Sequence, residues 1–523
     1  LNKMDYKISE RAKKVTLGSA VLGLVFLIIG FFQQKDFVYA KKVDDHSVEL
    51  LYNGHADVET QNQLKETIIS KMHGYQLEFH DSMHSANHDS DDKHKETTAH
   101  SEEAHSSSEQ DNHHGPTFKW LVHIDHAAHG DDHANTNSHE SGADMLVDMA
   151  NSGDVSFFDQ GLRRFWSNLL VNGFFFFGIA LGALFYLALH YATESGWGVV
   201  LLRILEGIMS AMPIGMAALL IVFIVGTFGG HHIYAWMDSH ILDPSSSHFD
   251  PIIYGKKAYL NIPFFWIRVA AYFTTFLLFL RWFKKKSKEE DEIGGTKIHF
   301  TMYRRAALFL VFFAVFSSTM SWDFIMSIDA HWFSTLFGWY VFSGIWLSGM
   351  IMVMMITLYL RKGGYLPFVN ESHIHDVGKF MFALSFLWSY LWFSQFMLIW
   401  YSNIPEEVIY FTERINNYKI LFFGTFIVNF FFPMVFFMSR DTKRSAGFLI
   451  VIGLLIFIGH WFDVFNMIMP GTLFDQWELG LLELGMFMMF LGIFIYSVLN
   501  SLSKAPLLLK NHPFLEESKH HEY

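Results

Sequence analysis

Titratable residues within long apolar runs are the side chains of this sequence best suited to chemistry. Each costs at least about 2–3 kcal/mol in lipid when it is unpaired, so each is a candidate functional group. One set falls in the outer half of the runs or at their outer rim, and comprises Arg268, Asp323, Asp329, His331, His460, Asp463, Glu478 and Glu483. A second set falls near the inner rim, and comprises His190, Glu194 and Glu206. Proton donors and acceptors at one depth can form a proton path or hold a quinol headgroup.

Most of these residues also have a structural interpretation. Asp329 precedes the segment AHWFST, and we expect it to cap the helix that follows, with His331 in the first turn. Glu478 favours the start of the last apolar helix through the helix dipole. Asp323 lies inside the end of a run and has no such explanation, which leaves open what its carboxylate faces.

The remaining charges raise the question of counter-ions. His460 and Asp463 are three residues apart and share one face of a helix. Arg268 is the candidate structural partner of Asp463 or of Glu483. Glu194 lies beside a short loop, where water is an adequate partner.

Long apolar segments must position these residues. Hydrophobic residues make up 51% of the 523 residues, and Phe alone accounts for 56. Runs of about 20 apolar residues indicate membrane-spanning helices. The predicted spans are 15–32, 167–190, 201–227, 260–282, 306–326, 333–360, 378–401, 418–438, 447–469 and 478–500. The sequence therefore predicts an all-α polytopic membrane protein with ten transmembrane helices.

Lys and Arg in the short loops predict the orientation of these helices. The segment before the first span, the predicted loop Arg281–Arg305, and the segments 361–364 and 439–444 are basic and fall on one side. We therefore expect both termini in the cytoplasm, and the polar segment 33–163 in the periplasm of a bacterial inner membrane. The formal net charge of −13 argues against a nucleic-acid partner.

The chain has no cysteine. Thiolate-ligated iron–sulfur clusters and covalent c-type haem at a CxxCH site are thereby excluded from this chain. We expect no redox cofactor of its own.

The polar segment combines foldable and low-complexity sequence. HSVELLYNG and GYQLEFHD read as short strands around a helical VETQNQLKETIISKMHG. The stretch 80–140 is rich in His, Ser, Asp and Glu, and such a composition is too polar to order itself. Residues 143–165 read as an amphipathic approach to the second span.

Histidines in the low-complexity stretch recur every three or four residues. The spacing would place each set on one helical face, as zinc or copper ligands require; the sets are His80, His84 and His88, then His123, His126, His129 and His133. We favour a solvated linker, and we expect no specific metal site.

Several motifs resemble one known family. The segment SWDFIMSIDAHWFSTLFGWYVFSG (321–344) resembles the signature of the ActF-type membrane subunit of bacterial alternative complex III, within the NrfD-like polysulfide reductase family. The segments KKAYLNIPFFWIR (256–268) and QFMLIWYSNIPEEVIYF (395–411) agree with it. The family form has Pro where this chain has Ala330. The resemblance covers the membrane part and not the His-rich stretch.

The resemblance implies two four-helix bundles, spans two to five and six to nine, flanked by spans one and ten. The corresponding segments are 1–32, 33–163, 164–327, 328–470 and 471–523. The partners it implies are an NrfD-like paralogue, an iron–sulfur subunit, c-type cytochromes and a terminal oxidase. Haem c and iron–sulfur clusters would belong to those partners, and menaquinone or ubiquinone would be the quinone.

Three functions follow from these observations. The leading one is a scaffold and proton-conducting subunit of a quinol-oxidising complex, not catalytic alone. The first alternative is a quinol-binding subunit, with the outer residues around the headgroup. The second alternative is a metal-ion transporter with a His-rich loop, for which His460 and Asp463 are the only mid-helix ligand pair.

Overall fold

The computed structural model describes residues 6–32, 38–44, 46–53, 58–72, 75–81, 117–126, 142–151, 158–244, 246, 249–473 and 477–522. They form two compact units, each with its own buried core. Residues 1–32 and 163–523 make up the helical unit, and residues 33–162 make up the polar unit.

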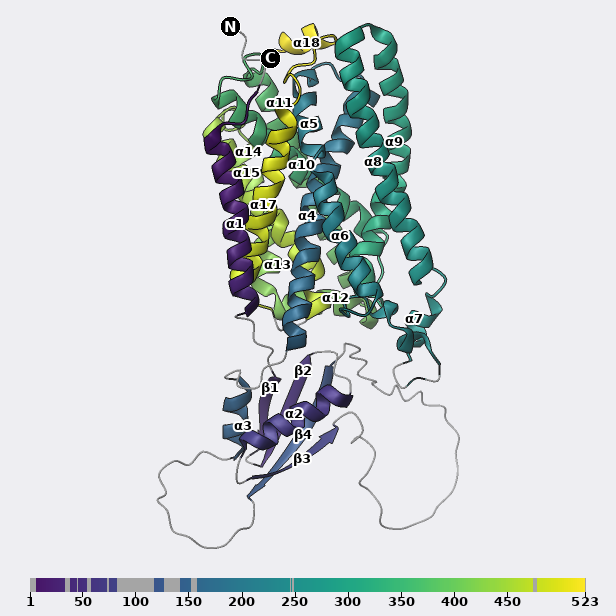
Figure 1. The fold of residues 1–523 in the computed structure, drawn as a ribbon, viewed down its shortest axis with the longest axis vertical. Coiled ribbons are helices and arrows are strands. Elements are labelled where there is room, and N and C mark those ends of the chain that lie inside the picture. Colours follow the sequence, from purple (N-terminus) through teal and green to yellow (C-terminus); the bar gives the residue numbers. More distant parts are fainter. Residues whose placement is uncertain are drawn as a thin grey trace. The chain divides into compact units, whose positions relative to one another are not determined.

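The helical unit confirms the predicted class of protein. Within the described residues, ten helices are long and apolar enough to cross a membrane (Figure 1). The spanning helices are α1 (Glu10–Phe32), α4 (Phe158–Ala192), α5 (Leu202–Met209) continued by α6 (Met212–Thr227), α8 (Ile262–Ile293), α9 (Thr296–Phe324), α10 (Leu336–Lys362), α11 (Glu371–Ser402), α13 (Lys419–Phe426) continued by α14 (Phe432–Phe437), α15 (Ala446–Ile468) and α17 (Leu481–Leu502).

Shorter elements connect or interrupt these spans. They are η1 (Val199–Leu201), η2 (Ala235–Met237), η3 (Ser239–Leu242), α7 (Pro251–Gly255), η4 (Met326–Ile328), α12 (Pro405–Asn417), the π-helical turn η5 (Ile427–Phe431), α16 (Pro470–Leu473) and α18 (Leu515–Lys519).

Close backbone packing joins the first and last spans. A Cβ atom at Gly23 or Gly30 of α1 would overlap the backbone of α17, and one at Gly485 or Gly492 of α17 would overlap the backbone of α1. Small residues permit such close approach, and close approach is what holds helices together where lipid removes the hydrophobic driving force. The glycines therefore explain why α1 lies along α17 (Figure 1).

The predicted basic loop Arg281–Arg305 is wrong in extent. Helix α8 continues to Ile293 and α9 begins at Thr296, so the turn consists of Gly294 and Gly295. Both glycines have positive φ, 69° and 81°, which side chains rarely adopt. The run KKKSKEEDE is rich in strong helix formers, so its charge marks the end of a span but not the end of a helix.

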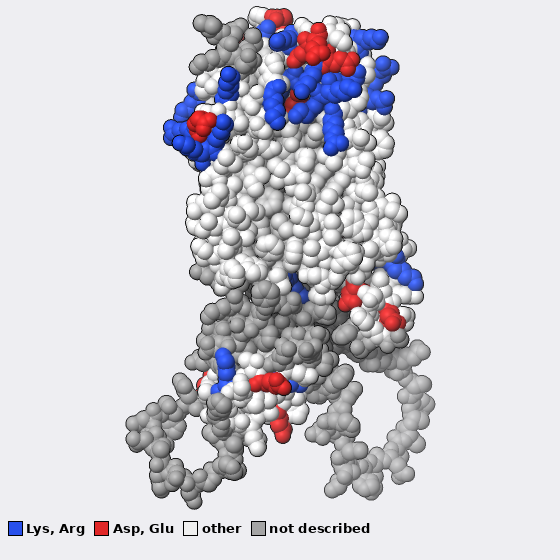
Figure 2. All heavy atoms as spheres, in the orientation of Figure 1, with Lys and Arg blue, Asp and Glu red and all other residues white. Residues whose placement is uncertain are grey.

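Basic side chains gather at one end of the helical unit. Figure 2 shows Lys and Arg concentrated at the end that carries the α8–α9 turn, next to a broad belt with few charges. Helix α18 and the start of α1 lie at this same end in Figure 1. This distribution is consistent with the expected cytoplasmic termini, and the orientation stays a prediction.

The polar unit is a four-stranded antiparallel sheet with two helices. The strands are β1 (Val38–Asp44), β2 (Ser47–Asn53), β3 (Tyr75–Asp81) and β4 (Thr117–His126), in the order β1-β2-β4-β3, and the helices are α2 (Val58–Lys71) and α3 (Gly142–Asn151). The two predicted strands and the helix between them are confirmed as β2, β3 and α2. The core includes Leu50, Leu64, Ile68, Trp120 and Val122.

Strand β4 corrects the interpretation of the His-rich stretch. It lies within 80–140, where no order was expected. The strand forms because TFKWLVHIDH alternates apolar and polar residues and buries Trp120, Val122 and Ile124. His123 and His126 are therefore on a strand and not on a helical face. The other predicted ligands, except His80 on β3, lie outside the described residues, namely His84, His88, His129 and His133.

The prediction that residues 143–165 lead into the second span is wrong for the part that forms α3. Helix α3 contacts β1, β2 and β4 and buries Ala143 and Leu146 in the core of the polar unit. Its amphipathic pattern reflects packing on the sheet.

Candidate functional site

Asp323 forms a buried ion pair with Arg268. Arg268 Nε donates to Asp323 Oδ2 at 2.8 Å and its Nη2 donates to Oδ1 at 2.9 Å, while Tyr272 adds a hydrogen bond to Oδ2 at 2.8 Å. The Asp323 side chain is fully buried. The bidentate geometry neutralises both charges and joins the start of α8 to the end of α9. The expectation that Arg268 faces Asp463 or Glu483 is wrong.

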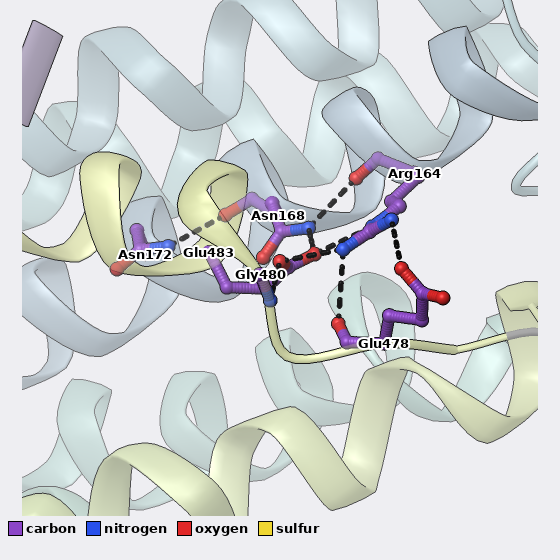
Figure 3. A network of polar contacts seen from close by, with 6 residues as sticks. All are labelled: Arg164, Asn168, Asn172, Glu478, Gly480 and Glu483. Atoms are coloured by element: carbon purple, nitrogen blue, oxygen red, sulfur yellow. Dashed lines mark hydrogen bonds and ion pairs between the residues drawn. The ribbon is translucent and has the colours of Figure 1, made fainter. Parts of the chain in front are cut away.

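Glu483 and Glu478 have a different cation, Arg164 at the start of α4 (Figure 3). Arg164 Nε and Nη2 each lie 2.7 Å from a carboxylate oxygen of Glu483, and its Nη1 lies 3.4 Å from Glu478 Oε2. The Gly480 amide also donates to Glu483, at 2.8 Å. The sequence interpretation missed Arg164, because it treated GLRRFW as a lead-in to the span.

A ladder of amides continues from this ion pair along α4. Asn168 Nδ2 donates to Glu483 Oε1 at 2.9 Å, and Asn172 Nδ2 donates to the Asn168 carbonyl at 2.9 Å (Figure 3). Asn172 Oδ1 accepts from Trp461 Nε1 at 3.0 Å. Because Arg164, Asn168 and Asn172 are four residues apart, they form one polar stripe that leads from the rim into the span.

Asp329 does not cap the next helix. Helix α10 begins at Leu336, and Thr335 at its N-cap makes no side-chain cap. Asp329 Oδ2 instead lies 3.4 Å from Nη2 of Arg414 on α12. Arg414 also donates to the carbonyls of Asn466 and Met467 at the end of α15, at 3.1 and 3.2 Å. The pair therefore holds the C-terminal end of α15, and the prediction of an N-cap is wrong.

His331 is also outside the first turn of α10. Its Nε2 lies 2.6 Å from Asp250 Oδ2, and Asp250 Oδ1 caps α7 by accepting from the amides of Ile252 and Ile253. Burial acts to raise the pKa of Asp250, but the Ile253 amide and His331 outweigh it, so the pKa is lowered. Asp250 and His331 thus attach the α7 loop to the segment before α10.

Asp463 is a buried carboxylate whose partners differ from those of Asp323 and Glu483. Tyr340 of α10 donates to Oδ1, Trp388 of α11 donates to Oδ2 at 2.8 Å, and His460 Nδ1 lies 3.7 Å from Oδ2. The predicted shared face of His460 and Asp463 is confirmed. Among the described residues, no Lys or Arg lies within 4.0 Å of the Asp463 carboxylate. Its hydrogen-bond donors are therefore neutral, unlike those of Asp323 and Glu483.

Two cavities adjoin Asp463. The first is also lined by His460, Gly344 and Ser348. The second is also lined by Tyr340, Gln395, Arg414 and Asn466. Three buried polar atoms around these cavities make no hydrogen bond: His460 Nε2, Gln395 Oε1 and Asn466 Oδ1. Buried polar atoms of this kind require an explanation, and a bound ligand or water is one.

Asn429 is a further polar residue that the sequence interpretation missed. It lies in the π-helical turn η5, packs against Gly459 beside His460, and leaves both amide atoms without a hydrogen bond. Single π-helical turns occur frequently at functional sites. The sequence offers no period that signals such a turn.

The inner-rim candidates do not form one cluster. Glu206 pairs with Arg203 at 2.6 Å and accepts from Ser287, while Glu194 is half exposed. His190 is buried, and neither ring nitrogen makes a hydrogen bond. Tyr186 lies one turn before it on α4, also with an unpaired hydroxyl.

The fold and these residues define the class as a multi-pass membrane protein with buried ionisable groups. No family model matches the chain. No curated protein matches it either.

Proposed function

We propose that this chain is a membrane subunit of a quinol-oxidising respiratory complex of the alternative complex III type, and that it conducts protons through Asp463 and His460. The resemblance of residues 321–344 to the signature of that family supports the assignment to the complex. The ten spans and the absence of cysteine support a subunit that has no redox centre of its own. Electron transfer then belongs to partner subunits that carry haem c and iron–sulfur clusters.

The neutral partners of Asp463 are the observation that carries the proton-conducting role. A carboxylate held by a guanidinium stays ionised, because protonation would leave the buried Arg charge without a partner. Asp323 and Glu483 are held in this way, whereas Asp463 accepts from a phenol and an indole. Asp463 can therefore take up and release a proton without leaving a buried Lys or Arg unpaired.

The polar groups around Asp463 suggest the two halves of a route. Toward the outer rim, Asn172 and Asn168 lead to Glu483 and, through Arg164, to the exposed Glu478. Toward the inner rim, the first cavity includes Ser348 and Gly178. From Asn172 to Tyr186 the helix advances 14 residues, roughly 21 Å at 1.5 Å per residue, and water in the cavity would have to bridge this distance.

Replacing Asp463 in the intact complex tests the role. Asp463→Asn keeps the size of the side chain and can still accept hydrogen bonds, but it cannot release a proton. We expect turnover to fall at least tenfold with little change in the KM for quinol, and Asp463→Glu to recover part of it. Asp441→Asn, in the connection between α14 and α15, is the matched control. Unchanged turnover of Asp463→Asn in an assembled complex would contradict the proposal.

Quinol binding is the second candidate, and the second cavity favours it. Gln395 Oε1 is a buried acceptor without a hydrogen bond, and Tyr340, Tyr410 and Trp392 provide aromatic walls. A quinol hydroxyl would donate to such an acceptor. Gln395→Leu should then raise the KM for quinol more than it lowers kcat, whereas an unchanged KM would exclude this cavity as the headgroup site.

Metal transport has less support. Among the described residues, the one group of three close metal-ligand side chains is Glu290, His299 and His512, which lies at the basic end and not at mid-span. Both Asp463 oxygens already accept hydrogen bonds. Purification of the native chain distinguishes the candidates: co-purification with haem-bearing partners supports the complex, and recovery of the chain alone supports a transporter.

A further inference from the structure

We propose that Glu290, His299 and His512 form a binding site for one divalent transition-metal ion of the zinc type, which fastens the C-terminal segment to the α8–α9 hairpin. One ligand atom from each residue lies within 4.8 Å of the other two. All three side chains are buried, with 0%, 3% and 6% of their surface exposed. Two histidines and one glutamate are an established ligand set for zinc.

Three separate elements bring these residues together. Glu290 lies in the last turn of α8, and His299 lies in the first turn of α9, across the turn formed by Gly294 and Gly295. His512 follows the last span by ten residues, which is enough chain to reach back to the hairpin. Figure 1 shows the hairpin and the C-terminal segment at the same end of the helical unit.

Asp291 fixes the C-terminal segment in place beside the ligands. Its Oδ1 accepts from the Lys510 amide at 2.9 Å, and its carbonyl accepts from Asn511 Nδ2 at 2.8 Å. Arg203 pairs with the same carboxylate. These contacts position His512 next to His299, with 5.0 Å between the ring centroids.

The candidate ligand atoms are free of hydrogen bonds at two of the three residues. Neither carboxylate oxygen of Glu290 makes a hydrogen bond, and neither does either ring nitrogen of His299. A buried carboxylate without a partner is costly, and coordination to a cation removes that cost. Tyr191 packs against both histidine rings and interacts with the Glu290 carboxylate. The site is therefore built from polar groups that make few other contacts within the fold, and the approach of Glu194 to His299 is one of these.

His512 already uses one ring nitrogen within the fold. Its Nδ1 accepts from the Phe514 amide at 3.2 Å. Coordination through either nitrogen replaces this long hydrogen bond, because an imidazole that binds metal through Nε2 carries its proton on Nδ1.

Small movements complete the coordination sphere. Bonds of about 2.0–2.1 Å in a tetrahedral site put ligand atoms roughly 3.3 Å apart, so each pair of ligand atoms approaches by up to about 1.5 Å. Glu194 Oε1 lies 3.8 Å from His299 Nε2 and can supply the fourth ligand.

Zinc retention by the full chain in its native complex tests the site. The complex is loaded with Zn²⁺, washed with a weak chelator, and its metal is measured by mass spectrometry. We expect Glu290→Gln and His512→Asn each to retain about one Zn²⁺ per chain less than the wild type. Glu289→Gln and His520→Asn are matched controls, since they make the same substitutions at an adjacent and at an exposed position, and should retain wild-type zinc. Equal zinc in Glu290→Gln and Glu289→Gln would overturn the proposal.

A second measurement does not depend on how the variants fold. Co²⁺ added to the wild-type complex should produce the visible absorption of a tetrahedral site, and Zn²⁺ should abolish it. Weak binding by the His-rich stretch is separated by competition with imidazole, which displaces single-histidine contacts first. No tetrahedral spectrum at equimolar Co²⁺ would overturn the proposal, whatever the variants retain.

Discussion

Asp323 and Asp463 show how the same residue type takes two roles inside a membrane. Asp323 is locked to Arg268 by two hydrogen bonds of 2.8 and 2.9 Å. Asp463 has neutral donors and adjoins two cavities. The first arrangement stabilises helix packing, and the second is the one that we propose to carry protons.

The Arg268–Asp323 pair should contribute more to the free energy of unfolding than to the turnover rate. Asp323→Asn leaves a buried guanidinium without its counter-charge, so it should lower the free energy of unfolding by about 3–5 kcal/mol. Thermal unfolding of the purified complex measures the loss. The double variant Arg268→Met with Asp323→Leu removes both charges and should recover much of it. A double variant less stable than Asp323→Asn alone would contradict the ion-pair interpretation.

The α7 loop should loosen in acid. The pKa of Asp250 is lower in the folded chain than in the unfolded chain. Its contribution is therefore complete above the unfolded pKa, and is lost as the pH falls through the lower folded value. Hydrogen exchange of residues 251–255 should accelerate over that range in the wild type. In Asp250→Ala, which removes the cap, it should be fast at every pH, and equal pH profiles of this variant and the wild type would contradict the proposed cap.

At the scale of elements, the membrane spans could be predicted from the sequence, whereas the ion pairs between the elements could not. A run of about 20 apolar residues is a local signal, so all ten spans follow from the sequence. Arg164 pairs with Glu483, 319 residues away in the sequence, and Arg414 pairs with Asp329, 85 residues away. No local sequence pattern encodes pairs of such separation. Strand β4 was missed for a different reason: its alternation is clear, but it is embedded in a stretch whose average composition indicates disorder.

The glycines of α1 test the packing of the first and last spans. Gly23→Ala places a methyl group against the backbone of α17, which should lower the free energy of unfolding by about 1–3 kcal/mol. Gly18→Ala is the matched control on the same helix, because its Cβ would meet nothing within 4 Å. Thermal unfolding compares the two, and equal midpoints would show that the α1–α17 contact is not tight.

At the scale of the whole molecule, the absence of cysteine makes the orientation directly measurable. Single cysteines at Glu66, on α2, and at His520, beyond the last span, report the two sides. With the outer membrane permeabilised, an impermeant maleimide should label Glu66→Cys and not His520→Cys. The reverse pattern would invert the topology and with it the outer and inner assignments of every candidate residue.

Proton movement through Asp463 is tested most directly by proton release from vesicles that contain the complex. With quinol as donor, a pH-sensitive dye measures the protons moved for each electron transferred. We predict that Asp463→Asn lowers this ratio in a complex that keeps its full set of subunits, while Asp441→Asn keeps the wild-type ratio. An unchanged ratio and rate in Asp463→Asn would show that protons do not pass through this residue.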